Sequence, residues 1–251
     1  MRKLLIYSAL VVGAAAPAFA QEMTVSGNIA VATDYTFRGL SQTDEGPAIQ
    51  GGVDGSIGGF YVGTWASNVD LGFDDSIELD IYTGYKFAIG PVALDIGAIG
   101  YLYPGAADDG ISQNTGELDY FEGFVKGSVS PANGLTLGGA AYFSPEFTGE
   151  TGEAYYLELN GAYAFTPSFS VSGAYGYQDI DNVFGVFSIG GGTSDSYSTY
   201  NFGGTFTALD LGFDLRYVGT SIDAGDPIIA ALFTTEAKSD DRVVFSIKKA
   251  M

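Results

Sequence analysis

The chain of 251 residues contains neither histidine nor cysteine. Without histidine, Ser-His and Asp-His hydrolytic sites and imidazole metal sites are excluded. Without cysteine, no disulfide framework can hold the chain together. We therefore predict that the protein is not an enzyme, with no catalytic, cofactor-binding or metal-binding residues and no cofactor.

Basic residues are also scarce. The chain has 10 Lys and Arg against 30 Asp and Glu, which gives a net charge of −20 at pH 7. Nucleic acid is excluded as a partner, because binding to phosphates needs clustered Lys and Arg. The acidity instead suits divalent cations or a pathway that prefers cations.

Long apolar runs are missing except at the start of the chain. Arg2 and Lys3 precede an apolar stretch at 4–16, which is too short for the roughly 20 residues that a spanning helix needs. Ala18-Phe19-Ala20 then offers small residues at both recognition positions of a signal peptidase. We predict a signal peptide at residues 1–20, cleaved after Ala20, and an exported domain at residues 21–251.

Glycine, tyrosine and phenylalanine are abundant, with 37, 17 and 18 residues. A hydrophobic content of 46% is too high for a disordered chain. Apolar residues alternate with polar or small ones along many segments. From Ile77 to Ile89 the odd positions are mostly apolar, whereas Glu78, Asp80 and Lys86 share the other face. This period of two is typical of half-buried β-strands.

Twelve segments show this alternation: 23–37, 47–57, 60–68, 76–89, 92–103, 116–129, 135–144, 153–165, 169–178, 198–207, 209–219 and 240–249. Short turns between them alternate with long loops at 38–46, 69–75, 104–115, 145–152, 179–197 and 220–239. This asymmetry is typical of bacterial outer-membrane barrels. We predict an all-β fold for residues 21–251: a transmembrane antiparallel up-and-down β-barrel of about 12 strands, with both termini on the periplasmic, short-turn side.

Aromatic residues lie near the ends of most apolar segments. The pairs are Tyr35 and Phe37, Tyr85 and Phe87, Tyr101 and Tyr103, Tyr142 and Phe143, Tyr163 and Phe165, and Tyr175 and Tyr177. A soluble β-sandwich also alternates, but it hides its apolar face and shows charge outside. We predict that these aromatics form interfacial girdles on a lipid-facing surface, with ordinary strand aromatics as the alternative.

The end of the chain departs from the usual barrel pattern. Val243, Phe245 and Ile247 still alternate, but the chain does not end in the aromatic residue common in barrel precursors. We interpret the last four residues, Lys248 to Met251, as an added tail.

Motifs in the first half of the chain carry a family resemblance. Residues 33–42 read Thr-Asp-Tyr-Thr-Phe-Arg-Gly-Leu-Ser-Gln, and further distinctive stretches lie at 47–52, 59–69, 78–85 and 101–105. This set resembles the opening of the TorF family of proteobacterial porins, and the second half is similar mainly in pattern. The resemblance implies an outer-membrane channel and brings no catalytic residues.

Charged residues on the polar strand faces should point into the barrel, because a base at mid-depth on the lipid face costs about 2–4 kcal/mol. The candidate lumen-lining residues are Asp34, Arg38, Asp54, Glu78, Asp80, Lys86, Asp95, Glu122, Lys126, Glu158, Asp214 and Arg216. Most of them are acidic, so an open lumen would prefer cations or polar neutral solutes. Alternatively, these groups pair across strands and fill the interior, since Glu122 with Lys126 and Asp214 with Arg216 share a face.

Arg38 is a lone base beside Asp34, and Asp44 and Glu45 follow in the next loop. It could brace that loop through a carboxylate pair or form part of a constriction, and we favour the brace. The long loops are acidic, for example at Asp70 and Asp108. None has the ligand spacing of a calcium loop, so we favour solvated surface charge over bound metal.

The leading functional hypothesis is an outer-membrane porin-like channel for passive diffusion of small solutes or ions, with a preference for cations. The alternative is a structural or surface-interaction barrel with a plugged lumen and functional extracellular loops. The expected partners are outer-membrane lipid, lipopolysaccharide bridged by divalent ions, and small solutes or ions. The expected location is the cell outer membrane.

Overall fold

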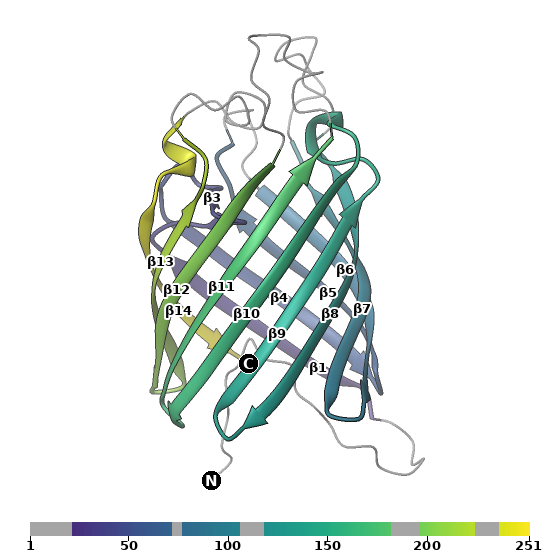
Figure 1. Ribbon diagram of the computed structural model, residues 1–251, viewed down its shortest axis with the longest axis vertical. Helices are drawn as coiled ribbons and strands as arrows, with labels where there is room; N and C mark the ends of the chain where they lie inside the picture. Colours follow the sequence, from purple (N-terminus) through teal and green to yellow (C-terminus); the bar gives the residue numbers. More distant parts are fainter. Residues whose placement is uncertain (1–21, 72–76, 106–117, 182–195, 224–235) are drawn as a thin grey trace.

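The computed structural model describes residues 22–71, 77–105, 118–181, 196–223 and 236–251. Twelve strands close into one antiparallel β-barrel (Figure 1), so the predicted fold class is confirmed. Within the described ranges, no helix has the length and apolar character needed to cross a membrane. The predicted signal peptide at 1–20 lies outside the described residues.

The barrel strands follow one another around the wall in chain order. Their bounds are β1 (Thr24–Ala32), β4 (Ala48–Ile57), β5 (Phe60–Asn68), β6 (Ile77–Ile89), β7 (Val92–Leu102), β8 (Tyr120–Ala132), β9 (Leu135–Ser144), β10 (Ala154–Thr166), β11 (Phe169–Ile180), β12 (Ser196–Ala208), β13 (Leu211–Thr220) and β14 (Arg242–Ala250). Two short 3₁₀ helices, η1 (Thr148–Glu150) and η2 (Glu236–Ser239), lie in connections. Because β14 also pairs with β1, these twelve strands leave no free sheet edge.

Successive side chains of each strand point alternately out of and into the barrel. On β6, Ile77 and Ile81 are exposed on the outer face, whereas Glu78 and Asp80 are buried. The outer face of β10 carries Leu159, which is 72% exposed. Such a belt of exposed apolar side chains around a closed wall matches the lipid-facing band of a transmembrane barrel.

Short connections join the strands at one end of the barrel, here called the turn end, and long connections join them at the other, the loop end (Figure 1). Leu209 and Asp210 connect β12 to β13, and their φ angles are 54° and 60°. A two-residue turn of this left-handed kind matches the twist of paired strands, so it joins neighbours without splaying them. The C-terminus also lies at the turn end (Figure 1).

The predicted aromatic girdles are partly wrong. Tyr85, Phe165 and Tyr175 are exposed on the outer face, as the prediction requires. The predicted girdle residues that instead lie inside the barrel are Tyr35, Phe37, Tyr101, Tyr103 and Tyr142. The physical reason is that a strand-end aromatic fits the interior equally well where the lumen is filled, and strand-end position alone does not specify a face.

The interpretation of the last residues as an added tail is also wrong. Lys248, Lys249 and Ala250 belong to β14, where they pair with Ala30, Ile29 and Asn28 of β1. Met251 exchanges two backbone hydrogen bonds with Gly27. These residues therefore form part of the seam that closes the barrel.

The segment predicted as the end of the first strand and a long outer loop turns into the barrel instead. β1 ends at Ala32, and residues 33–47, called the inner hairpin, carry two short paired strands, β2 (Thr36–Phe37) and β3 (Leu40–Ser41). Arg38 and Gly39 form the tight turn between them, with φ angles of 47° and 84°. An added Cβ at Gly39 would lie 2.5 Å from Thr220 Cγ2, so glycine lets the turn approach the wall.

A charge on the outer face should destabilise the barrel far more than the same charge on the inner face. We expect Leu159→Arg to lower the free energy of unfolding in lipid vesicles by about 2–4 kcal/mol, because it places a base in the lipid at mid-strand. Asn160→Arg is the matched control, since its side chain faces the interior beside Glu158. Equal losses in urea unfolding would contradict the assignment of the two faces.

Candidate functional site

The inner hairpin lies across the barrel lumen and contacts strands on several sides of the wall. It is adjacent in sequence only to β1 and β4, yet its side chains bind β6, β8, β11 and β14. The barrel wall thus holds this segment by side-chain contacts that are remote in sequence, which makes the hairpin the centre of the candidate site.

Arg38, at the tip of the hairpin, forms an ion pair with Glu122 on β8. The Nη2 atom of Arg38 lies 2.6 Å from Oε2 of Glu122, and its Nη1 atom donates to Gln178 on β11 over 2.8 Å. The two charged side chains are only 5% and 0% exposed. The guanidinium also lies over the rings of Tyr156 and Tyr142, 4.4 and 5.2 Å from their centroids, which adds a cation–π attraction.

Tyr35 binds the wall at β6, two strands away from the strand that carries Glu122. Its hydroxyl donates to Glu78 on β6 over 2.7 Å, and the hydroxyl of Tyr103 donates to the same carboxylate over 3.0 Å. Burial raises the pKa of Tyr35, and the nearby carboxylate of Glu78 raises it further, so the hydroxyl remains protonated and able to donate. The ring of Tyr35 packs edge-on against Trp65, with centroids 5.3 Å apart.

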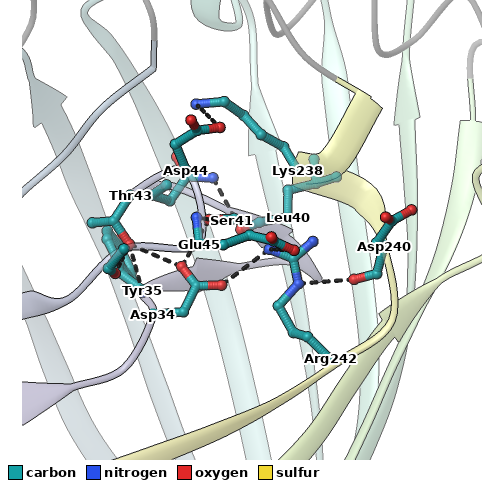
Figure 2. Close-up of polar contacts among 12 residues, drawn as sticks. Asp34, Tyr35, Leu40, Ser41, Thr43, Asp44, Glu45, Lys238, Asp240 and Arg242 are labelled. Atoms are coloured by element: carbon teal, nitrogen blue, oxygen red, sulfur yellow. Dashed lines mark hydrogen bonds and ion pairs between the residues drawn. The ribbon is translucent and has the colours of Figure 1, made fainter.

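Asp34 fixes the base of the hairpin. Its Oδ1 atom accepts hydrogen bonds from Ser41 and Thr43, over 2.7 and 2.8 Å. Its Oδ2 atom pairs with Nη1 of Arg242, at the start of β14, over 3.0 Å. Figure 2 shows Arg242 reaching toward both Asp34 and Glu45, so one base holds both ends of the hairpin.

A second basic residue holds the loop-end side of the hairpin. Lys238 on η2 is 1% exposed, donates to the backbone carbonyl of Asp70 and lies 3.9 Å from the carboxylate of Asp44 (Figure 2). η2 itself packs against β3. The connection between β13 and β14 is therefore fastened to the hairpin and to the connection after β5.

An apolar cluster fills part of the loop end of the barrel, next to these polar contacts. Its buried members are Leu40, Val69, Leu71, Tyr101, Tyr103, Tyr120, Phe147, Ala154, Ile180 and Tyr197. The rings of Tyr101 and Tyr120 stack with centroids 4.5 Å apart. The hairpin thus packs on one side against rings and aliphatic side chains contributed by the wall.

Interior charges nearer the turn end follow a different pattern. Asp54 accepts from Tyr82, and Asp95 accepts from Tyr61. In the strand register Asp95 lies opposite Lys86 on one side and Lys126 on the other. The two ammonium groups lie over aromatic rings, with Lys86 4.5 Å from the Tyr61 centroid.

Sequence reasoning paired some interior charges correctly and others wrongly. Asp214 and Arg216 form the predicted ion pair, at 3.1 Å. Glu122 does not pair with Lys126 but with Arg38. Arg38 in turn binds a carboxylate of the barrel wall, whereas Asp34 and Glu45 pair with Arg242 and Asp44 with Lys238. The cause is the inward path of residues 33–47, which carries Arg38 to the far wall.

All twelve candidate lumen-lining residues lie on inward-facing strand positions or in the inner hairpin. The site also uses residues that the sequence interpretation missed, namely Gln178, Lys238, Arg242 and the inward tyrosines. Tyr101 and Tyr103 share the strand parity of Asp95, a signal that could have assigned both to the interior. The alternation of β14 also places Arg242 on the inward face, whereas Lys238 lies before that strand and the alternating pattern carries no signal for it.

The predicted acidic loops are described only in part. Asp74, Asp75, Asp108, Asp109 and Asp226 lie outside the described residues. Among the residues that the structure describes, no group of three or more acidic side chains is arranged to hold a metal ion.

Comparison with known proteins gives a family. Residues 15–251 match a family described as "Bacterial protein of unknown function (Gcw_chp)". The chain belongs to this family. No curated protein sequence is a significant match.

Several solved structures share the fold. A KdgM porin aligns with 89% of the chain and 98% of its own length, at 9% identity and a TM-score of 0.55. A NanC porin aligns with 90% of the chain and 98% of its own length, at 9% identity and a TM-score of 0.51. At such identities the likeness concerns the fold alone, which is that of outer-membrane porins.

Removing the basic side chain of the buried ion pair should lower the free energy of unfolding more than removing the basic side chain of a partly exposed ion pair. We expect Arg38→Met to lower the free energy of unfolding by about 3 kcal/mol, because it leaves Glu122 buried without its base. Arg216→Met is the control, with its pair 21–24% exposed, and should cost about 1 kcal/mol or less. Urea unfolding in vesicles measures both.

The double variant Arg38→Met with Glu122→Gln separates the pair from the packing of the arginine side chain. It should recover a large part of the loss, since no uncompensated carboxylate remains. A double variant no more stable than Arg38→Met alone would contradict the role of the ion pair.

Proposed function

We propose that the chain is an outer-membrane channel for passive diffusion of small solutes or ions, exported through a signal peptide cleaved after Ala20. Its closed wall with an apolar outside and a charged inside supports this function. The fold likeness to porins and the TorF resemblance at residues 33–105 support it as well. The surrounding lipid, including lipopolysaccharide, would contact the apolar belt.

The observation that carries the proposal is the inner hairpin across a lumen lined with charges. A segment held inside a barrel by wall side chains narrows the path and sets the size of what passes. Here Arg38 and Arg242 fix the tip and the base of the hairpin to opposite regions of the wall. The hairpin is therefore the constriction of the proposed channel, and the solutes are small.

The proposed cation preference arises at the level of the hairpin. Among the described residues, acidic groups outnumber basic ones there: Asp34, Asp44, Glu45, Glu78 and Glu122 against Arg38, Lys238 and Arg242. Nearer the turn end, acidic and basic groups are balanced. The acidic ones are Asp54, Asp95, Glu158 and Asp214, and the basic ones are Lys86, Lys126, Arg216 and Lys248. Charge selection thus depends on the constriction.

The second candidate function is a plugged barrel that acts through its loops. The specific observation in its favour is the burial at the hairpin, where Glu122 is fully buried and an apolar cluster packs against Leu40. A plug of this kind closes the lumen to solutes, so the two candidates differ in the conductance of the native chain.

Planar-bilayer recordings separate the two candidates. For a channel, the native chain should give discrete current steps with a cation-selective reversal potential, and deletion of residues 36–41 should enlarge the steps several-fold by removing the constriction. Asp54→Asn, away from the hairpin, is the control and should leave the step size almost unchanged.

Silence of the native chain at high protein load, with steps only after the deletion, supports the plugged barrel and overturns the channel. Steps of equal size in both proteins would show that the hairpin is not the constriction.

A further inference from the structure

A cavity of about 350 Å³ lies in the barrel against the inner hairpin. Its volume is at the lower end of the roughly 300–1,000 Å³ range of small-molecule sites. The residues that matter for recognition are Arg38 from the hairpin, Tyr142 and Tyr156 from β9 and β10, Glu158, Asn201 on β12 and Arg216 on β13. The lining thus combines aromatic rings, an amide, a carboxylate and guanidinium groups from five parts of the chain.

Several hydrogen-bonding groups in this lining have capacity to spare. Among the described residues, the hydroxyl of Tyr142 and the Nδ2 amide of Asn201 have no hydrogen-bond partner. Glu158 accepts from Tyr156 and Asn160, over 3.2 and 2.9 Å, and a carboxylate offers about four lone-pair positions. The cavity therefore presents donors and acceptors together, which suits a ligand that carries both.

The basic groups of the lining are already neutralised. Arg38 binds Glu122 and Gln178. Arg216 directs two hydrogen bonds to Asp214 and one each to Asn201 and Ser172. A ligand carboxylate would find no free base here and would meet the negative charge of Glu158. Electrostatics thus favours an uncharged ligand.

We propose that this cavity is a binding site for a neutral, ring-shaped polyhydroxylated solute, a monosaccharide in its pyranose form. Hydroxyl groups that donate and accept match Tyr142, Asn201 and Glu158, and the apolar face of a sugar ring packs against tyrosine rings. The proposal rests on the proposed channel function and names its solute class. The site lies beside the constriction, where a weakly held solute is positioned for passage.

The binding test uses the full barrel, folded in a zwitterionic detergent that carries no sugar headgroup. Saturation-transfer NMR with D-glucose should show weak, saturable binding, and D-glucuronate should bind at least several-fold more weakly. Tyr142→Phe and Glu158→Gln should each weaken glucose binding by about five- to tenfold, since each removes one hydrogen-bonding group.

Tyr82→Phe is the matched control, because it also removes one inward tyrosine hydroxyl, bound to Asp54 and outside the cavity. It should leave glucose binding unchanged. Heat-modifiable migration on gels verifies that every variant is folded. Absent glucose binding, binding unaffected by Tyr142→Phe and Glu158→Gln, or glucuronate binding at least as tight as glucose would each overturn the proposal.

Bilayer recordings, combined with the binding measurements, test the sugar site and the channel function separately. Steps in the native chain without glucose binding in detergent overturn the sugar site and leave the channel intact. Glucose binding that depends on Tyr142 in a protein that conducts nothing supports the site and overturns the channel. If the chain both conducts ions and binds glucose, glucose should reduce the ion current of the native chain. The same glucose concentration should reduce the current of Tyr142→Phe several-fold less.

Discussion

Closure of the backbone hydrogen-bond network is the constraint on which the rest of this structure depends. In lipid no water is present to bind an exposed amide, so every strand of a spanning sheet needs two partners. β14 meets this requirement by pairing with β1 through residues Ser246 to Ala250. Once the wall is closed, the alternation of side chains along each strand is enough to place apolar side chains outside and charged ones inside.

Closure of the barrel also leaves interior space and buried charges, and the inner hairpin fills this space and pairs with these charges. A ring of twelve strands encloses more space than its inward side chains fill, and buried charges there require partners. The hairpin supplies Arg38 to Glu122 and Tyr35 to Glu78, and it takes Arg242 from the wall for Asp34. The interior is thus organised by contacts between distant parts of the chain, with polar pairs around the hairpin and aromatic packing at the loop end.

The sequence predicts local features of this fold well and long-range ones poorly. Strand existence, turn positions and the inward direction of Glu78 or Asp214 follow from a period of two, which each segment carries by itself. The path of residues 33–47 cannot be predicted from this periodicity, because an inward hairpin and an outer loop have the same composition. That single difference explains why the partners of Arg38 and Glu122 were predicted wrongly. The turn at Arg38-Gly39 was the available local signal for it.

The central claim is that residues 33–47 lie inside the barrel, and the contact between Tyr35 and Trp65 tests it most directly. Trp65 is the only tryptophan, so its indole resonances are assigned without ambiguity in protein folded in detergent micelles. With ring centroids 5.3 Å apart, nuclear Overhauser effects should connect the indole to the Tyr35 ring and vanish in Tyr35→Leu. Indole contacts only to residues of β4, β5 and β6 would place the segment outside the lumen and contradict the account.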